Sequence, residues 1–228
     1  PVGIVDIHRV QLEGQHEWLA RVLPRLLSAR LSTEPSLVVL EREDLGLLQK
    51  EKQLAAGEDT PFWESGILVD GRLQRAEGGV LEMVLRWRRG GREGVISTPL
   101  DPNAPTQAVE TVAIGLLKDA METSSLVRWE PDKEAEEFFR QAMLLRAHRR
   151  HENAFAPFEA AQALQPDKIP YAGALFMNEW GLRGLAWDTG AIDPTGRSHY
   201  SDEQLAELVS SIVRGVRRGW ETRCLSSR

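Results

Sequence analysis

The feature that most constrains the fold is the loss of strand signals after Trp129. Before that residue, short runs rich in β-branched side chains alternate with amphipathic helix patterns. From Pro131 to Leu164 the apolar residues recur only at helical spacing. A chain that changes period in this way is expected to hold two structural parts. We therefore predict a mixed α/β domain over residues 1–128, followed by an all-α helical segment over residues 129–228.

The first part is predicted to begin with alternating strands and helices and to end with a β-hairpin and a helix. Strands are expected at 2–7, 37–40, 66–69, 80–87 and 95–98, and helices at 18–27, 45–54 and 109–120. The predicted helix at 18–27 connects the first two strands as a crossover, which implies that a parallel strand pair is present. The hairpin formed by 80–87 and 95–98 implies antiparallel strands. The expected fold class is thus α/β, in the α+β sense of a mixed sheet with flanking helices.

Local signals mark where these elements turn or stop. The pairs Asp70-Gly71 and Gly90-Gly91 are typical of turns. Thr106 is a candidate N-cap for the helix that follows it. Pro24 is expected to kink or interrupt the first helix, because an interior proline removes one hydrogen bond.

Composition narrows the class of protein. Apolar residues make up 42% of the 228-residue chain and charged residues 27%, as in ordinary globular proteins. The net charge of -6 argues against nucleic acid as a partner. The single cysteine, Cys224, excludes an intrachain disulfide and a cysteine-only metal site. No apolar run is long enough for a transmembrane helix. Because Pro1 lies at the start of a strand-like run without a preceding methionine, we expect a longer parent protein.

Residues 135–166 carry a fixed pattern of bulky and small side chains. The pattern consists of Phe138, Ala142, Leu145, Ala154, Phe158, Ala161 and Pro166. This spacing resembles one tetratricopeptide repeat, in which small residues let two antiparallel helices approach and aromatic residues fill the gaps. Gln141 replaces the usual leucine, and Pro157 falls early in the second helix. The helical segment is therefore expected to be tetratricopeptide-like.

The tetratricopeptide resemblance implies that the helical segment binds a protein or peptide partner. Such repeats usually bind on the face of their first helices. The matching candidates here are Glu136, Phe139, Met143 and Arg146. The alternative is that Phe139 and Met143 belong to the core. A second, degenerate unit is expected near Ile169, where Gly181 and Gly184 interrupt the repeat pattern. A single repeat cannot bury its own face, so the repeat is expected to pack on the α/β domain, on the last helix of the chain or on a further part of the parent protein.

The stretch from Val38 to Glu51 has a distinctive order. An apolar strand leads into Glu41-Arg42 and then a leucine-bearing helix ending in Lys50-Glu51. With the strand and hairpin that follow, residues 1–122 resemble the CsgG and TolB N-terminal-like group of bacterial envelope proteins. The resemblance implies a non-enzymatic domain for assembly at the cell envelope, in or near the periplasm, and a cytoplasmic location stays open. Pore formation, which some members of the group show, is not inferred for this chain. A local ion pair is the simpler interpretation of Glu41 and Arg42.

Catalytic, cofactor and metal motifs are not found in the sequence. The segment His148 to Glu152 has its histidines three apart, not the four of a helical zinc motif, and falls at a predicted turn. No glycine-rich phosphate loop or nucleophile elbow occurs. We expect no enzyme activity, although acids scattered along the chain could still meet in space to form a site.

The sequence thus favours a protein–protein interaction or scaffolding module. The alternative is a nucleic-acid or nucleotide-binding regulatory domain that uses the arginine-rich hairpin 86–92, with Trp87 stacking on a base. A simpler interpretation of that hairpin is that its arginines keep an exposed sheet edge soluble.

Overall fold

The fold is taken from a computed structural model, which describes residues 2–9, 16–40, 66–76, 78–122 and 127–188, together with residues 206, 209 and 210. The chain divides into two compact units, Pro1–Trp129 and Glu130–Arg228. The helix predicted at 45–54, the Glu41-Arg42 pair and Cys224 lie outside the described residues.

The first unit is built on a mixed five-stranded sheet in the order β2-β1-β3-β4-β5. Its strands are β1 (Val2–Arg9), β2 (Val39–Leu40), β3 (Ile67–Arg75), β4 (Leu81–Arg89) and β5 (Arg92–Pro99). Strand β1 pairs in parallel with both β2 and β3, while β3, β4 and β5 pair antiparallel. The predicted mixture of parallel and antiparallel pairing is therefore confirmed.

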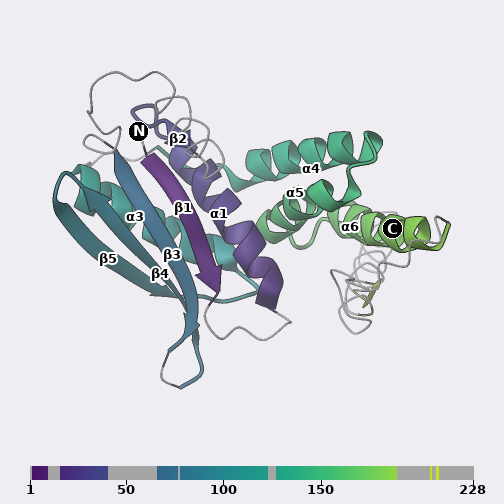
Figure 1. Cartoon of the computed structure of the whole chain (residues 1–228), viewed down its shortest axis with the longest axis horizontal. Coiled ribbons are helices and arrows are strands. Elements are labelled where there is room, and N and C mark those ends of the chain that lie inside the picture. The colour runs from purple at the N-terminus through teal and green to yellow at the C-terminus, as the bar shows by residue number, and fades with distance from the viewer. Residues whose placement is uncertain are drawn as a thin grey trace, which may run out of the picture. The chain divides into compact units, whose positions relative to one another are not determined.

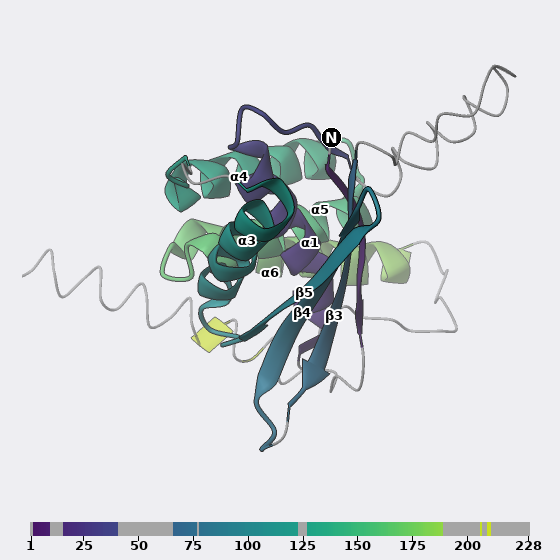
Figure 2. The same ribbon diagram turned by 90° about the vertical axis from the view of Figure 1, so that its left-hand side faces the viewer.

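Two helices cover one face of this sheet, as Figures 1 and 2 show. They are α1 (Glu17–Ser32) and α3 (Pro105–Met121). Apolar side chains from both helices and from the facing side of the strands form the core, including Leu19, Leu23, Leu26, Val109, Val112, Leu116, Val69, Met83 and Leu85. Alternate residues of β3 and β4 enter this core, as the period of two requires.

Two local predictions in this unit are wrong, and a third is wrong in part. Helix α1 continues through Pro24, so the helix does not restart there. Asp70-Gly71 is not a turn, because β3 continues to Arg75 and buries Leu73; the chain reverses instead at Gly78 and Gly79, which have positive φ. Thr106 does not cap α3, since Pro105 occupies the first helical position and Ala104 is the cap residue.

The turn at Gly90-Gly91 is confirmed. The φ angles of these two glycines are 52° and 81°, which a two-residue turn between twisted strands requires. The turn joins β4 to β5 with an unbroken register from Arg89↔Arg92 to Glu82↔Pro99. Strand β5 consequently forms one edge of the sheet (Figure 1).

A buried charge cluster ties α1 to α3. The Arg30 side chain is fully buried and donates from Nε to Glu110 at 2.5 Å and from Nη1 to Glu34 at 3.0 Å. The same Nη1 also donates to the Thr33 hydroxyl at 2.8 Å. Glu34 in turn accepts the backbone N–H of Val127 at 3.1 Å. The cluster thus joins both helices to the chain segment that ends the unit.

The second unit is helical in its described part. It contains α4 (Pro131–Ala147), α5 (His151–Leu164) and α6 (Ile169–Asp188). Its core brings together Ala142, Ala154, Phe155, Phe158 and Leu175, with Phe139 and Leu145 packed against them. Helix α6 begins at Ile169 and continues through Gly181 and Gly184, so the two glycines that interrupt the repeat pattern do not interrupt the helix. Glycine disfavours a helix by only about 1 kcal/mol relative to alanine.

Candidate functional site

The four residues predicted to contact a partner lie on one side of α4. Glu136, Phe139, Met143 and Arg146 recur at spacings of three and four, which places them along a single helix face. The structure puts them in different environments. Glu136 and Met143 are exposed, whereas Phe139 and Arg146 are half-buried.

Phe139 packs inward. Its ring lies 5.8 Å from that of Phe158 on α5 in an edge-to-face arrangement, and 4.7 Å from that of Tyr171 on α6. Phe158 and Tyr171 are both buried. Phe139 therefore links the three helices, and a partner could reach only the part of its ring that stays exposed.

Glu136 and Lys168 form a polar border beside this aromatic cluster. The Lys168 ammonium lies 3.4 Å from Glu136 Oε1 and 4.6 Å from the centre of the Tyr171 ring. Interaction with the Tyr171 side chain, and then with Glu136, raises the pKa of Lys168. The ammonium is therefore a fixed positive charge at neutral pH, between a carboxylate and an aromatic ring.

Apolar side chains are exposed on both α4 and α6. Met143 is 37% exposed and Met177 is 55% exposed. These two methionines are 34 residues apart in the sequence. Leu144, at 60%, is also exposed on α4, but one residue further along and so turned by about 100° from Met143.

The arginine-rich hairpin does not form one continuous patch. Arg89 donates to the carbonyl of Ala120 at 2.7 Å, and Arg92 donates to Asp119 and Glu122, so both lie at the C-terminal end of α3. Cations favour that end of a helix. Trp87 is only 4% exposed, on the core side of β4. A buried indole cannot stack on a base, which removes the aromatic contact that the nucleic-acid alternative requires.

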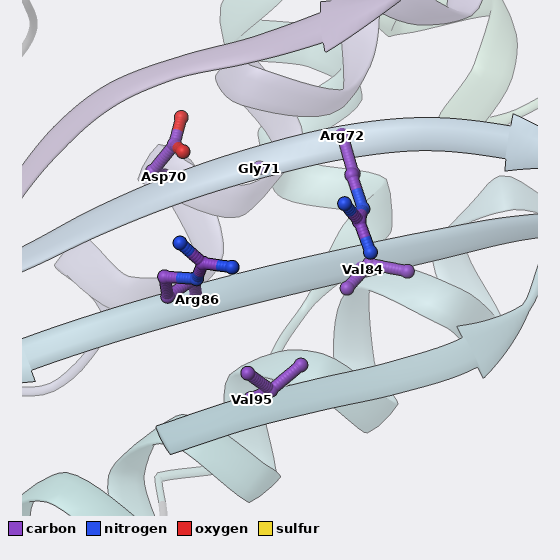
Figure 3. Close-up of a pocket in the computed structure, with 6 residues that line it drawn as sticks. All are labelled: Asp70, Gly71, Arg72, Val84, Arg86 and Val95. Atoms are coloured by element: carbon purple, nitrogen blue, oxygen red, sulfur yellow. The ribbon is translucent and has the colours of Figure 1, made fainter. Parts of the chain in front are cut away.

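The other face of the sheet carries a small hollow of about 150 Å³. It is lined by Asp70, Gly71, Arg72, Val84, Arg86 and Val95 (Figure 3). Arg86 stands opposite Asp70 on one side and opposite Val95 on the other in the strand register. The hollow therefore combines two guanidinium groups, one carboxylate and two valines on adjacent strands.

No protein-family model, curated protein or solved structure matches the chain. Any function must therefore be argued from the chain's own residues.

Two further structural findings bear on function. Within the described ranges, no group of histidine, cysteine, aspartate and glutamate side chains is gathered closely enough to hold a metal ion. Across the same part of the chain, no helix combines the length and apolar character needed to cross a membrane.

Sequence reasoning missed the neighbours of the predicted face. Lys168 and Tyr171 lie beside Glu136 and Phe139, although some 30 residues separate them along the chain. The hollow was missed because Asp70-Gly71 was interpreted as a turn. The 34-residue spacing of the exposed methionines was the one signal that could have found Met177.

Proposed function

We propose that this chain is a non-enzymatic protein-interaction or scaffolding module that binds an extended peptide or protein surface along α4 and α6. The observation that carries the proposal is the pair of exposed methionines, Met143 and Met177, 34 residues apart on two helices that both pack on α5. That spacing equals the length of a tetratricopeptide unit. Methionine is an adaptable side chain that is common on surfaces binding varied partners.

In this proposal α4 and α5 are the two helices of one tetratricopeptide-like repeat, and α6 is the first helix of the next. The burial of Ala142 and Ala154 with Phe158 supports it, because these are positions where the repeat needs small residues and an aromatic. The binding face then includes Glu136, Met143 and Arg146, with the exposed part of Phe139.

We also propose that the module belongs to a larger bacterial protein associated with the cell envelope. The strand–helix–strand opening of the first unit and its antiparallel β3-β4-β5 meander are compatible with the CsgG and TolB N-terminal-like group. The role assigned to the first unit is assembly rather than catalysis.

A displayed library of random linear peptides, selected on the full chain, tests the proposal. Binding of an enriched, fluorescently labelled peptide is then measured by anisotropy for the wild type and for Met143→Glu and Met177→Glu. We expect each substitution to weaken binding by about tenfold or more, because a hot-spot side chain contributes about 2 kcal/mol.

Leu144→Glu is the matched control, since Leu144 is an exposed apolar residue on a different side of α4. It should leave the affinity unchanged. A library without enriched peptides, or enriched peptides that bind the methionine variants as tightly as the wild type, would refute the proposed face.

A further inference from the structure

The outer edge of β5 is a part of the surface that the proposed function does not use. β5 is the last strand in the sheet order and pairs only with β4 in the described part of the chain (Figure 1). It is eight residues long, its register has no bulge, and it contains no lysine. Its one proline, Pro99, is its last residue. Natural proteins usually block such an edge with charged side chains, proline or a bulge. The two charged residues of β5, Arg92 and Glu93, lie at its turn end, and Arg92 pairs with Glu122.

The hairpin geometry fixes which backbone groups face outward. A two-residue turn makes its flanking residues a hydrogen-bonded pair, here Arg89 and Arg92, and such pairs alternate along an antiparallel ladder. The N–H of Leu100 donates to the carbonyl of Leu81 at 2.8 Å, which continues this alternation. The N–H and C=O groups of Glu93, Val95 and Ser97 therefore point away from β4.

The same three residues place their side chains on the open face of the sheet. Val95 is opposite Arg86 in the register and is 61% exposed, which is high for a valine in a strand. Ser97 and Glu93 are also exposed. The edge thus offers three donors and three acceptors in succession around an exposed apolar side chain.

We propose that a second copy of this chain covers this edge, with β5 pairing antiparallel to β5 about a two-fold axis at Val95. In that register Val95 faces Val95 of the second copy, and Glu93 faces Ser97. Gly94 faces Ile96 on the side of the helices. No like charges stand opposite each other, and the serine hydroxyl can donate to the glutamate. This self-complementarity is what a two-fold interface requires and what favours a second copy over a foreign strand.

The dimer would join the two sheets into one. On the open face, Asp70, Arg86 and Val95 stand side by side on β3, β4 and β5. Across the two-fold axis this row would continue with Val95, Arg86 and Asp70 of the second copy. Since Val95 and Arg86 line the hollow, the two hollows would meet across the axis. The interface lies in the first unit and does not rest on the peptide binding proposed for α4 and α6.

Site-specific disulfide formation tests the register. The full chain with Cys224→Ser and Val95→Cys should form a disulfide-linked dimer on mild oxidation. Residues that face each other in a hydrogen-bonded antiparallel pair have Cα atoms about 5.5 Å apart, within the range that a disulfide spans. The control is Ser97→Cys in the same background. Its two cysteines would be four residues out of register, roughly 13 Å apart, and should not link.

Sedimentation equilibrium of the full chain provides the second measurement. Val95→Lys should weaken dimerisation by at least about tenfold, because it sets two ammonium groups face to face. Val80→Lys changes a similarly exposed valine, 52% exposed, outside β5 and should have no effect. A wild-type chain that stays monomeric at all attainable concentrations would overturn the proposal. Equal cross-linking through Val95→Cys and Ser97→Cys would do the same.

Discussion

Replacing Arg30 by methionine should destabilise the first unit severely. Methionine keeps most of the apolar stem of arginine, so the substitution mainly removes the guanidinium. Among the described residues, the Glu34 carboxylate, only 4% exposed, then keeps one hydrogen-bond donor, the N–H of Val127. The side chain of Glu110, 36% exposed, can regain water. Leaving one member of a buried pair without its counter-charge costs about 3–5 kcal/mol.

The cost can be measured by calorimetric unfolding of the full chain. For a unit of this size, a loss of 3–5 kcal/mol corresponds to a drop of roughly 10–20 °C in Tm. Hydrogen exchange should show faster opening of α1 and α3, which locates the effect in the first unit. Adding Glu34→Leu to Arg30→Met should recover part of the loss, since no buried charge is then left unpaired.

The matched control is Arg92→Met. Arg92 also pairs with a glutamate, Glu122, but both side chains are more than half exposed, at 58% and 75%. Its loss should cost only about 0–1 kcal/mol. The reasoning fails if Arg30→Met is as mild as Arg92→Met, or if the Arg30→Met/Glu34→Leu double variant is less stable than Arg30→Met alone.

Three further substitutions and one control give separate tests, each by thermal unfolding. Gly94→Ala should lower the free energy of unfolding by about 1–3 kcal/mol, because the added Cβ would lie 2.6 Å from Trp87 Nε1. Gly173→Ala should be neutral or stabilising, because the added Cβ would meet nothing within 4 Å beyond its chain neighbours and the adjacent backbone of its own helix. Phe139→Ala should lower the free energy of unfolding by about 2–4 kcal/mol, because the contacts with the rings of Phe158 and Tyr171 are lost. A change near zero would contradict the inward packing of Phe139. Burial raises the pKa of the Glu134 carboxyl above its ordinary 4.5, because burial disfavours the charged form. The charged carboxylate therefore destabilises the folded protein at high pH, and this penalty is relieved as pH falls through the raised pKa. Glu134→Gln should therefore be more stable than the wild type at about pH 7, with the difference closing near pH 4, and a constant difference would contradict this.

Much of the fold was predictable because it depends on local periodicity. The alternation from Leu81 to Trp87 and the Gly90-Gly91 turn gave the β4–β5 hairpin, and the apolar spacing from Val109 to Ala120 gave α3. The errors arose where tertiary contacts outweigh a local signal. Asp70-Gly71 has a turn composition, but Leu73 is buried only if β3 continues beyond it.

The candidate site was less predictable, because its parts meet only after the helices pack. Spacing along α4 identified Glu136, Phe139, Met143 and Arg146 as one face but could not show that Phe139 turns inward. That outcome depends on Tyr171, which lies on α6. In the sheet, Arg86 and Val95 become neighbours through strand register, which the sequence specifies only once the pairing is known.

Amide hydrogen exchange of the full chain, with and without a selected peptide at a concentration near its wild-type Kd, tests the proposed binding role most directly. The proposal predicts that the peptide slows exchange in α4 and α6 of the wild type, and that Met143→Glu largely removes this protection at the same peptide concentration. Protection confined to other segments, or protection of α4 and α6 that persists in Met143→Glu, would contradict it.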